Sequence, residues 1–173
     1  MSKVFAIIIG VIVVGAIGWL VISNSNAPKK TEHQTQSERA PDFRLQDYDG
    51  KTVSLGDFHG KSLAINSWAA WCPFCRKELS DFAKVQKEFG DRVIIIAVDR
   101  AETLAVAKKY TDELGVTNGM LFLLDPSDSF YQSIGGFSMP ETIFVDKNSN
   151  IKIHKRGPMD SDEIREKIKQ LLK

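Results

Sequence analysis

An apolar run near the amino end is the feature that most constrains how this 173-residue chain can fold. Val4 to Ile22 is a stretch of 19 residues without a charge or a proline. A helix of that length rises about 28 Å, which just crosses a hydrocarbon core of about 30 Å. Trp19 lies near the end of the run, where aromatic side chains favour the membrane interface. We therefore expect residues 1–23 to form one N-terminal transmembrane anchor.

A cleaved signal peptide is the alternative interpretation of this run. Ser25-Asn26-Ala27 offers the small residues that a signal peptidase requires. The run is longer than a usual signal core and Pro28 would follow the cut, so an uncleaved anchor is the favoured interpretation. Positive charges lie on both sides, at Lys3 and at Lys29 and Lys30, so charge alone does not orient the anchor.

The rest of the sequence divides into a polar linker and one domain. Residues 24–40 are rich in Ser, Asn, Gln and Thr without an apolar period, which is typical of a flexible tether. Residues 41–173 are long enough for a single domain with its own core. They carry 19 basic and 20 acidic residues, so a nucleic-acid partner, which needs a basic surface, is not expected.

Strand and helix patterns alternate along residues 41–173. Asp49-Gly50 favours a hairpin turn, and Val93–Val98 is a continuous apolar run typical of a strand buried on both faces. The expected strands are 43–45, 52–55, 63–67, 93–98, 120–124, 142–145 and 151–154, and the expected helices are 73–89, 101–114, 129–134 and 161–172, the last with Ser161 as N-cap. This order predicts an α/β fold, in which helices flank both faces of a central mixed β-sheet that begins with an N-terminal β-hairpin.

The two cysteines, Cys72 and Cys75, stand where a strand passes into a helix. Pro73 suits the first helical position, because its missing N–H would have no partner there. Free N–H groups and the helix dipole favour a thiolate on Cys72, and the thiolate is the form that attacks a disulfide. Cys75 lies one turn later, within reach of a bridge to Cys72. We therefore predict that Cys72 is the nucleophile and Cys75 the resolving thiol, and that the pair stores two electrons without a cofactor.

Zinc sites and structural disulfides also use Cys-x-x-Cys pairs. Zinc needs four ligands, and the only histidines are His33, His59 and His154, none of them at paired ligand spacing. A structural bridge across so short a loop would remove little chain entropy. The pair is better explained as a redox centre, and no metal is expected.

The segment from Asn66 to Glu78, with its Trp-Cys-Pro-x-Cys centre, resembles the active site of the thioredoxin superfamily. The resemblance is closest to membrane-anchored thiol–disulfide oxidoreductases of the TlpA, ResA and CcmG (DsbE) type, which have a redoxin-like domain. It runs from about Pro41 to the C-terminus and implies a thioredoxin-like fold. Further matching motifs are Ala40-Pro41-Asp42-Phe43, Asp49-Gly50-Lys51 and Met139-Pro140-Glu141-Thr142, whose Pro-Glu-Thr version is nearest to the CcmG type.

This resemblance implies roles for residues around the cysteine pair. Pro140 matches the cis-proline that faces the cysteines, although most X–Pro bonds are trans. Residues expected to contact the substrate are Trp71, Pro73, Phe74, Met139 and Pro140. Trp68 is expected to belong to the core instead.

Glu78 and Asn66 lie at the two ends of the motif. Glu78 follows Cys75 by three residues on the same helical face, where a carboxylate would raise the pKa of the thiols and could relay a proton. The alternative is a solvated first-turn glutamate that complements the helix dipole, and the sequence leaves both open. Asn66 stands where cytosolic thioredoxins carry a buried Asp. Because an amide cannot exchange protons, we expect Asn66 to be a structural, hydrogen-bonded residue.

Together these features predict a single-pass protein of the cytoplasmic membrane, with an extracytoplasmic thiol–disulfide oxidoreductase domain. The resemblance implies that protein disulfides are the substrates and that the domain reduces them. It also implies apocytochrome c as a client, in cytochrome c maturation, and a membrane electron donor of the DsbD or CcdA type.

Three other functions fit a redoxin-like body. A thiol peroxidase would carry Thr three residues before its reactive cysteine and a Pro upstream, but the matching residues are Ala69 and Ile65. A disulfide-forming oxidase is not decided by the Pro-Phe dipeptide between the cysteines. A copper chaperone would need wider cysteine spacing and a suitable downstream histidine, which His154 does not provide by motif.

Overall fold

A seven-stranded mixed sheet organises residues 38–173, the part of the chain that the computed structural model describes. Its strands are β1 (Arg44–Asp47), β2 (Thr52–Ser54), β3 (Leu63–Trp68), β4 (Ile94–Arg100), β5 (Leu121–Asp125), β6 (Glu141–Val145) and β7 (Ile151–Arg156). They lie in the order β2-β1-β5-β4-β3-β6-β7. The central strands β3, β4 and β5 are parallel, and the strands on both flanks pair antiparallel. The predicted mixed sheet and N-terminal hairpin are confirmed.

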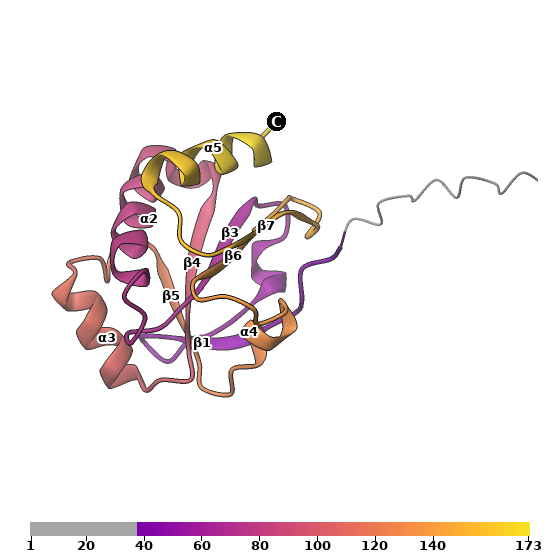
Figure 1. Ribbon diagram of the computed structural model, residues 1–173. Helices are drawn as coiled ribbons and strands as arrows, with labels where there is room; N and C mark the ends of the chain where they lie inside the picture. The colour runs from indigo at the N-terminus through magenta and orange to yellow at the C-terminus, as the bar shows by residue number, and fades with distance from the viewer. Residues whose placement is uncertain (1–37) are drawn as a thin grey trace, which may run out of the picture. The chain divides into compact units, whose positions relative to one another are not determined.

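Helices cover both faces of this sheet, as the order of elements predicts. The helices are α2 (Cys75–Phe89), α3 (Leu104–Glu113), α4 (Ser129–Ser133) and α5 (Ser161–Leu171), with short 3₁₀ turns η1 (Leu55–Phe58) and η2 (Gly90–Arg92). One face packs against α2, α3 and α5, and the opposite face packs against η1 and α4 (Figure 1).

Strand β4 shows why the central strands are continuous apolar runs. Successive side chains of a strand point to opposite faces of the sheet. Ile95 accordingly packs in the cluster beneath α2 and α5, whereas Ile96 and Val98 pack in the cluster on the opposite face. Both faces are covered, so β4 has no solvent-facing positions along its middle.

Two helices begin two and three residues later than predicted, and a third has a different N-cap. Helix α2 begins at Cys75 rather than Pro73, with Phe74 at the N-cap. Helix α3 begins at Leu104, because the Thr103 side chain accepts a hydrogen bond from Val106 N–H and caps it. Asp160, not Ser161, caps α5: its carboxylate accepts from the first two backbone N–H groups that follow Ser161. The predicted Ser161 cap is wrong, because a carboxylate also offsets the helix dipole at that end.

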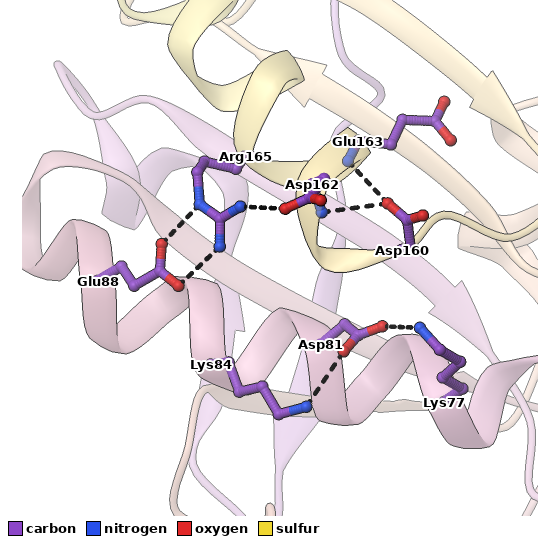
Figure 2. Close-up of polar contacts among 8 residues, drawn as sticks. All are labelled: Lys77, Asp81, Lys84, Glu88, Asp160, Asp162, Glu163 and Arg165. Carbon is purple, nitrogen blue, oxygen red and sulfur yellow. Dashed lines mark hydrogen bonds and ion pairs between the residues drawn. The ribbon is translucent and has the colours of Figure 1, made fainter.

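Helix α5 lies along α2 through an apolar seam and an ion pair. Ile164 and Ile168 are fully buried against the part of α2 that carries Phe82 and Val85. Outside this seam, the Arg165 guanidinium donates two hydrogen bonds to Glu88, at 2.8 and 2.9 Å (Figure 2). The contact fixes the segment that leads into α5, which also supplies a partner to the functional site.

The predicted anchor, residues 1–23, and nearly all of the tether lie outside the described residues. Within residues 38–173 no helix is long and apolar enough to span a bilayer. Glu38 O accepts from Ile151 N–H at 2.7 Å, and Ala40 N–H donates to Ser149 O at 2.9 Å. These bonds attach residues 38–40 to the β6–β7 hairpin, directly before the expected domain start near Pro41.

Candidate functional site

The cysteine pair lies where β3 leads into α2, at the carboxyl edge of the parallel strands. Cys72 and Cys75 form a disulfide with their Cα atoms 5.4 Å apart. A tight turn precedes it, in which Cys72 N–H donates to Ala69 O at 3.1 Å. Cys75 N–H points back at Cys72, 3.2 Å from its Sγ. The same N–H also lies 3.2 Å from Cys72 O. A helix-start N–H this close to the sulfur would stabilise a Cys72 thiolate after reduction, as the sequence predicts.

Aromatic side chains surround the cysteine pair in two different ways. Trp68 is fully buried and stacks on Tyr110 at 5.6 Å between ring centroids, so its predicted core role is confirmed. Trp71 and Phe74 are 62% and 61% exposed, and Pro73 between the cysteines is also exposed. The cysteines themselves are 2% and 0% exposed. Trp71, Pro73 and Phe74 thus form an exposed apolar rim around a shielded sulfur pair.

The loop before β6 faces the same cluster. The Met139–Pro140 peptide bond is cis, as the motif predicts. Met139 packs against the apolar cluster that contains both cysteines, and Pro140 is buried. Phe137, two residues before Met139, is 77% exposed and lies beneath the Arg156 guanidinium, 4.9 Å from its ring centroid. Sequence reasoning missed Phe137, because nothing in the local pattern marks an exposed aromatic in a glycine-rich loop.

Glu141 holds this loop in place from inside the sheet. Its buried carboxylate accepts hydrogen bonds from Phe137 N–H at 3.0 Å and Ser138 N–H at 3.2 Å. The other oxygen contacts His154 Nε2 at 2.7 Å and Arg156 Nε at 3.3 Å. Glu141 thereby connects the cis-proline loop to β7, an anchoring role that the Pro-Glu-Thr motif did not by itself reveal.

Glu78 is buried in the same layer as the cysteines, one helical turn after Cys75. Its carboxylate accepts from Asn66 Nδ2 at 3.0 Å and from Met159 N–H at 2.9 Å. Burial raises the pKa of Glu78 to about 8, against the opposing effect of these two hydrogen bonds. The solvated alternative for Glu78 is therefore wrong. A carboxyl with this pKa can hold or release a proton near neutral pH.

Asn66 is the structural residue that the sequence predicts. It is fully buried in β3 and its Nδ2 group donates both to Glu78 and to Thr142 Oγ1, the latter at 2.9 Å. It therefore ties helix α2 to strand β6 behind the cysteines.

Two acidic residues near the Ala69–Cys72 turn were also not predicted from the sequence. Glu102, in the loop after β4, accepts a hydrogen bond from Ala70 N–H at 2.7 Å. Asp99 lies at the end of β4, in register with Trp68, and is fully buried. The available signal was an acidic residue directly after the continuous apolar run of β4. No group of three or more His, Cys, Asp or Glu side chains in residues 38–173 is arranged to hold a metal ion.

Comparisons with known proteins agree with this geometry. The Redoxin family model matches residues 35–172. Thiol-disulfide oxidoreductase ResA of Bacillus thuringiensis subsp. konkukian is 26% identical, with 96% of this chain and 95% of the relative covered. Thiol:disulfide interchange protein DsbE of Allochromatium vinosum is 30% identical, with 84% and 80% covered.

A solved structure confirms the thioredoxin-like fold. The exposed lipoprotein thioredoxin Etrx1 of Streptococcus pneumoniae superposes with a TM-score of 0.68 at 31% identity, over 76% of this chain and 100% of that one. Residues 35–172, which the Redoxin family model matches, include the cysteine pair, the buried Glu78 and the cis-proline loop. The chain therefore belongs to the Redoxin family and is a thiol–disulfide oxidoreductase of the ResA and DsbE type.

Proposed function

We propose that this protein is a membrane-tethered, extracytoplasmic reductase of protein disulfides. The observation that carries the proposal is the Cys72–Cys75 pair at the start of α2, with the cis-proline loop packed against it and the buried acid Glu78 one turn behind. The dithiol can pass two electrons to a client without any cofactor. The exposed rim of Trp71, Pro73 and Phe74 offers the client chain an apolar contact surface.

Exchange would proceed in two balanced steps. The Cys72 thiolate attacks one sulfur of the client disulfide, that bond breaks, and the departing client thiolate takes up a proton. Cys75 then loses its proton and attacks Cys72 Sγ, which releases the second client thiol and forms the Cys72–Cys75 disulfide. Glu78, whose pKa of about 8 keeps it mostly protonated near neutral pH, is suited to give its proton to the departing client thiolate and then to receive the Cys75 proton. The client gains two electrons and two protons, which the dithiol loses.

Met139 and Pro140 are proposed to bind the client backbone beside the sulfurs, because Met139 packs on the cysteine cluster and the loop is anchored by Glu141. The proposed client class includes the haem-binding cysteines of apocytochrome c, and the proposed donor that re-reduces the dithiol is a membrane protein of the DsbD or CcdA type. Support comes from the Pro-Glu-Thr motif and from the DsbE relative.

The redox potential of the full chain tests the direction of electron flow. Equilibration with glutathione or dithiothreitol should give a value nearer to the about −270 mV of thioredoxin than to the about −120 mV of a strong oxidant. A value near −120 mV would identify an oxidase and overturn the reductase proposal.

Trapping tests the residue roles. Cys75→Ser should accumulate mixed disulfides between Cys72 and clients, because the resolving thiol is missing. The matched control is Cys72→Ser, which should trap none. Trapping through Cys75 alone would reverse the two assignments.

A peroxidase assay distinguishes the proposed reductase from a thiol peroxidase, the main alternative. Ile65 and Ala69 are buried and apolar, so neither supplies a hydroxyl to activate a peroxide beside Cys72. Reduction of insulin or of an apocytochrome disulfide should therefore exceed peroxide turnover by the same protein. Faster peroxide turnover would assign a peroxidase instead.

Residues 1–23 are proposed as the anchor and the segment that follows as the tether. The full chain should stay with membranes after alkaline carbonate extraction, and a variant lacking residues 4–22 should not. A mature protein that begins at Pro28 would show cleavage instead. Protease treatment of intact cells should digest the domain if it lies outside the cytoplasm.

A further inference from the structure

Asp99 is a buried acid that the exchange mechanism does not use. It is the last but one residue of β4, and its backbone pairs in register with Trp68, the residue that ends β3. The side chain is 0% exposed, and among residues 38–173 neither of its oxygens has a hydrogen-bond donor as a partner. A buried carboxylate without a donor is costly, so the carboxyl has a strong reason to keep its proton.

Glu102 is the neighbouring carboxylate that can accept a hydrogen bond from a protonated Asp99. Two carboxylates cannot hydrogen bond to each other, but a protonated Asp99 can donate to Glu102. Burial, the contact with Glu102 and the negative charges of Glu102 and Asp125 together raise the pKa of Asp99 to about 9. The Asp99 carboxyl is therefore neutral at physiological pH and supplies the missing donor itself.

Glu102 connects the Asp99 proton to the Ala69–Cys72 turn, which carries the nucleophilic cysteine. Its Oε2 atom accepts from Ala70 N–H at 2.7 Å, and the next bond along the chain is Cys72 N–H to Ala69 O at 3.1 Å. Glu102 is only partly buried and lines a cavity of about 410 Å³, so protons can reach the pair from solvent. The connection Asp99–Glu102–Ala70 thus runs from the core to the backbone that carries Cys72.

Other ionisable groups face the pair from every element packed on it. Tyr48 approaches from the β1–β2 turn, Asp125 from the end of β5, and Tyr110 from α3. The cation that faces Tyr110 is Arg76 of α2, whose guanidinium lies over the ring. Neither carboxyl of the pair forms an ion pair within residues 38–173. A second negative charge at the pair would therefore lack a direct counter-ion.

We propose that Asp99 and Glu102 share one proton and act as a pair of positioning residues that hold the Ala69–Cys72 turn for thiol–disulfide exchange. With the proton present, Asp99 donates to Glu102, and the single charge of Glu102 accepts Ala70 N–H. When the proton leaves, two adjacent carboxylates repel each other and the Ala70 contact weakens. The inference rests on the proposed function, because the turn matters through Cys72. It adds a pH limit to exchange that is independent of the cysteines' own ionisation.

Nuclear magnetic resonance of the full chain in detergent, labelled with ¹⁵N-alanine, tests the pair directly. The Ala70 amide signal of the oxidised wild-type protein should shift through one ionisation near pH 9. In Asp99→Asn the Asn amide still donates to Glu102 but cannot titrate, so the shift should vanish while the Ala70 bond persists. Asp81→Asn is the matched control, since it changes another buried carboxylate, which pairs with Lys77 and Lys84 within α2, and should keep the wild-type shift.

Glu102→Ala provides a second variant. It removes the acceptor of Ala70 N–H, so exchange of that amide with solvent should accelerate by about tenfold or more. Glu113→Ala, an exposed glutamate of α3, should leave the exchange rate unchanged. A wild-type Ala70 signal that stays flat from pH 6 to 10, or that titrates equally in Asp99→Asn, overturns the proposal.

The rate of client reduction gives the functional readout. Above the pH at which Asp99 ionises, wild-type turnover should fall relative to that of Asp99→Asn. The pH profiles of the two proteins should differ only in that range. If the protein reduces no disulfide at any pH, the proposed function fails, yet the Ala70 titration still decides whether the pair exists. Identical pH profiles of turnover in the two proteins would contradict the positioning role.

Discussion

Two glutamates are buried on the two sides of the dithiol, and their partners differ in charge. Glu78, on the helix that carries Cys75, accepts hydrogen bonds only from the neutral groups of Asn66 and Met159. Glu141, behind the cis-proline loop, accepts from two backbone N–H groups and also pairs with Arg156 and His154. Both side chains are 0% exposed. The two glutamates are therefore equally buried, but Glu78 has only neutral hydrogen-bond partners, whereas Glu141 also pairs with the cationic Arg156.

The difference teaches that burial alone does not decide what a carboxyl does. With only neutral hydrogen-bond partners, burial dominates at Glu78 over the smaller opposing charge of Lys155 and raises its pKa to about 8, so this acid can exchange a proton during the reaction. At Glu141 the cationic partner and four contacts make the carboxylate a structural link between the loop and β7. The expected division is that Glu78 controls chemistry and Glu141 controls the shape of the client-binding loop.

Removal of Glu141 should have the largest effect on stability. Glu141→Ala leaves the N–H groups of Phe137 and Ser138 without an acceptor, so the free energy of unfolding should fall by about 3 kcal/mol. Urea denaturation measures this fall. Glu141→Gln keeps one acceptor oxygen and should lose less. A loss below about 1 kcal/mol in Glu141→Ala would show that the loop holds itself and that the link is dispensable.

Removal of the Glu78 proton should instead affect the reaction. Glu78→Gln cannot accept the Cys75 proton, so the rate of insulin reduction near neutral pH should fall by about tenfold to a hundredfold. The fall should lie in turnover rather than in KM, because Glu78 is buried away from the exposed rim. Lys87→Gln, at an exposed position of the same helix, is a control for altered charge on α2. An unchanged turnover would remove Glu78 from the mechanism and leave it a structural residue like Glu141.

Local sequence patterns were sufficient for the parts of the site that are local. The Trp-Cys-Pro-x-Cys segment predicts the disulfide, because its two cysteines stand three positions apart at a helix start. The Met-Pro-Glu-Thr motif predicts the cis bond at Pro140, and the alternation of apolar runs predicts the central strands. Each of these follows from residues that are neighbours along the chain.

The surroundings of Glu78 and Asp99 could not be predicted in the same way. Glu78 is buried because Met159, 81 residues later, donates its N–H to it, and because α5 closes over that side. The Glu102 contact with Ala70 likewise spans 32 residues. Helical spacing shows which face Glu78 occupies, but only the packing of distant segments determines whether that face meets water.

The pH dependence of stability sharpens the contrast further. The Glu78 carboxyl has a pKa of about 8 when folded and its ordinary value near 4.5 when unfolded. Between these values the folded protein binds a proton that the unfolded chain has released, so stability must fall as pH rises. Asp99, with a pKa raised to about 9, acts in the same direction. Carboxyls whose pKa is lowered in the folded protein, such as Glu88, change the folding stability only at more acidic pH, where they take up protons.

The oxidised protein should therefore be more stable at pH 5 than at pH 8, with a slope on the order of 1 kcal/mol per pH unit. Urea titrations at several pH values measure the slope. Glu78→Gln should reduce the slope and leave the share that Asp99 contributes, whereas Glu113→Gln, at an exposed position, should not change it. A slope of the opposite sign would mean that the neutral form of Glu78 is not the form that folding selects.

The smallest effect is expected where the cis-proline loop meets solvent. Phe137 is 77% exposed, so Phe137→Ala should change folding stability little, yet it removes an aromatic ring that Arg156 orients beside the client path. Loss of a contact of this kind corresponds to about a twofold to fivefold rise in KM for a protein disulfide, with turnover unchanged. Phe137→Leu keeps an apolar side chain without the ring face, so its KM should lie between those of the wild type and of Phe137→Ala. If small disulfides such as oxidised dithiothreitol show the same rise, Phe137 does not act through client binding. A rise confined to protein clients would place recognition on the Glu141 side of the dithiol and proton transfer on the Glu78 side.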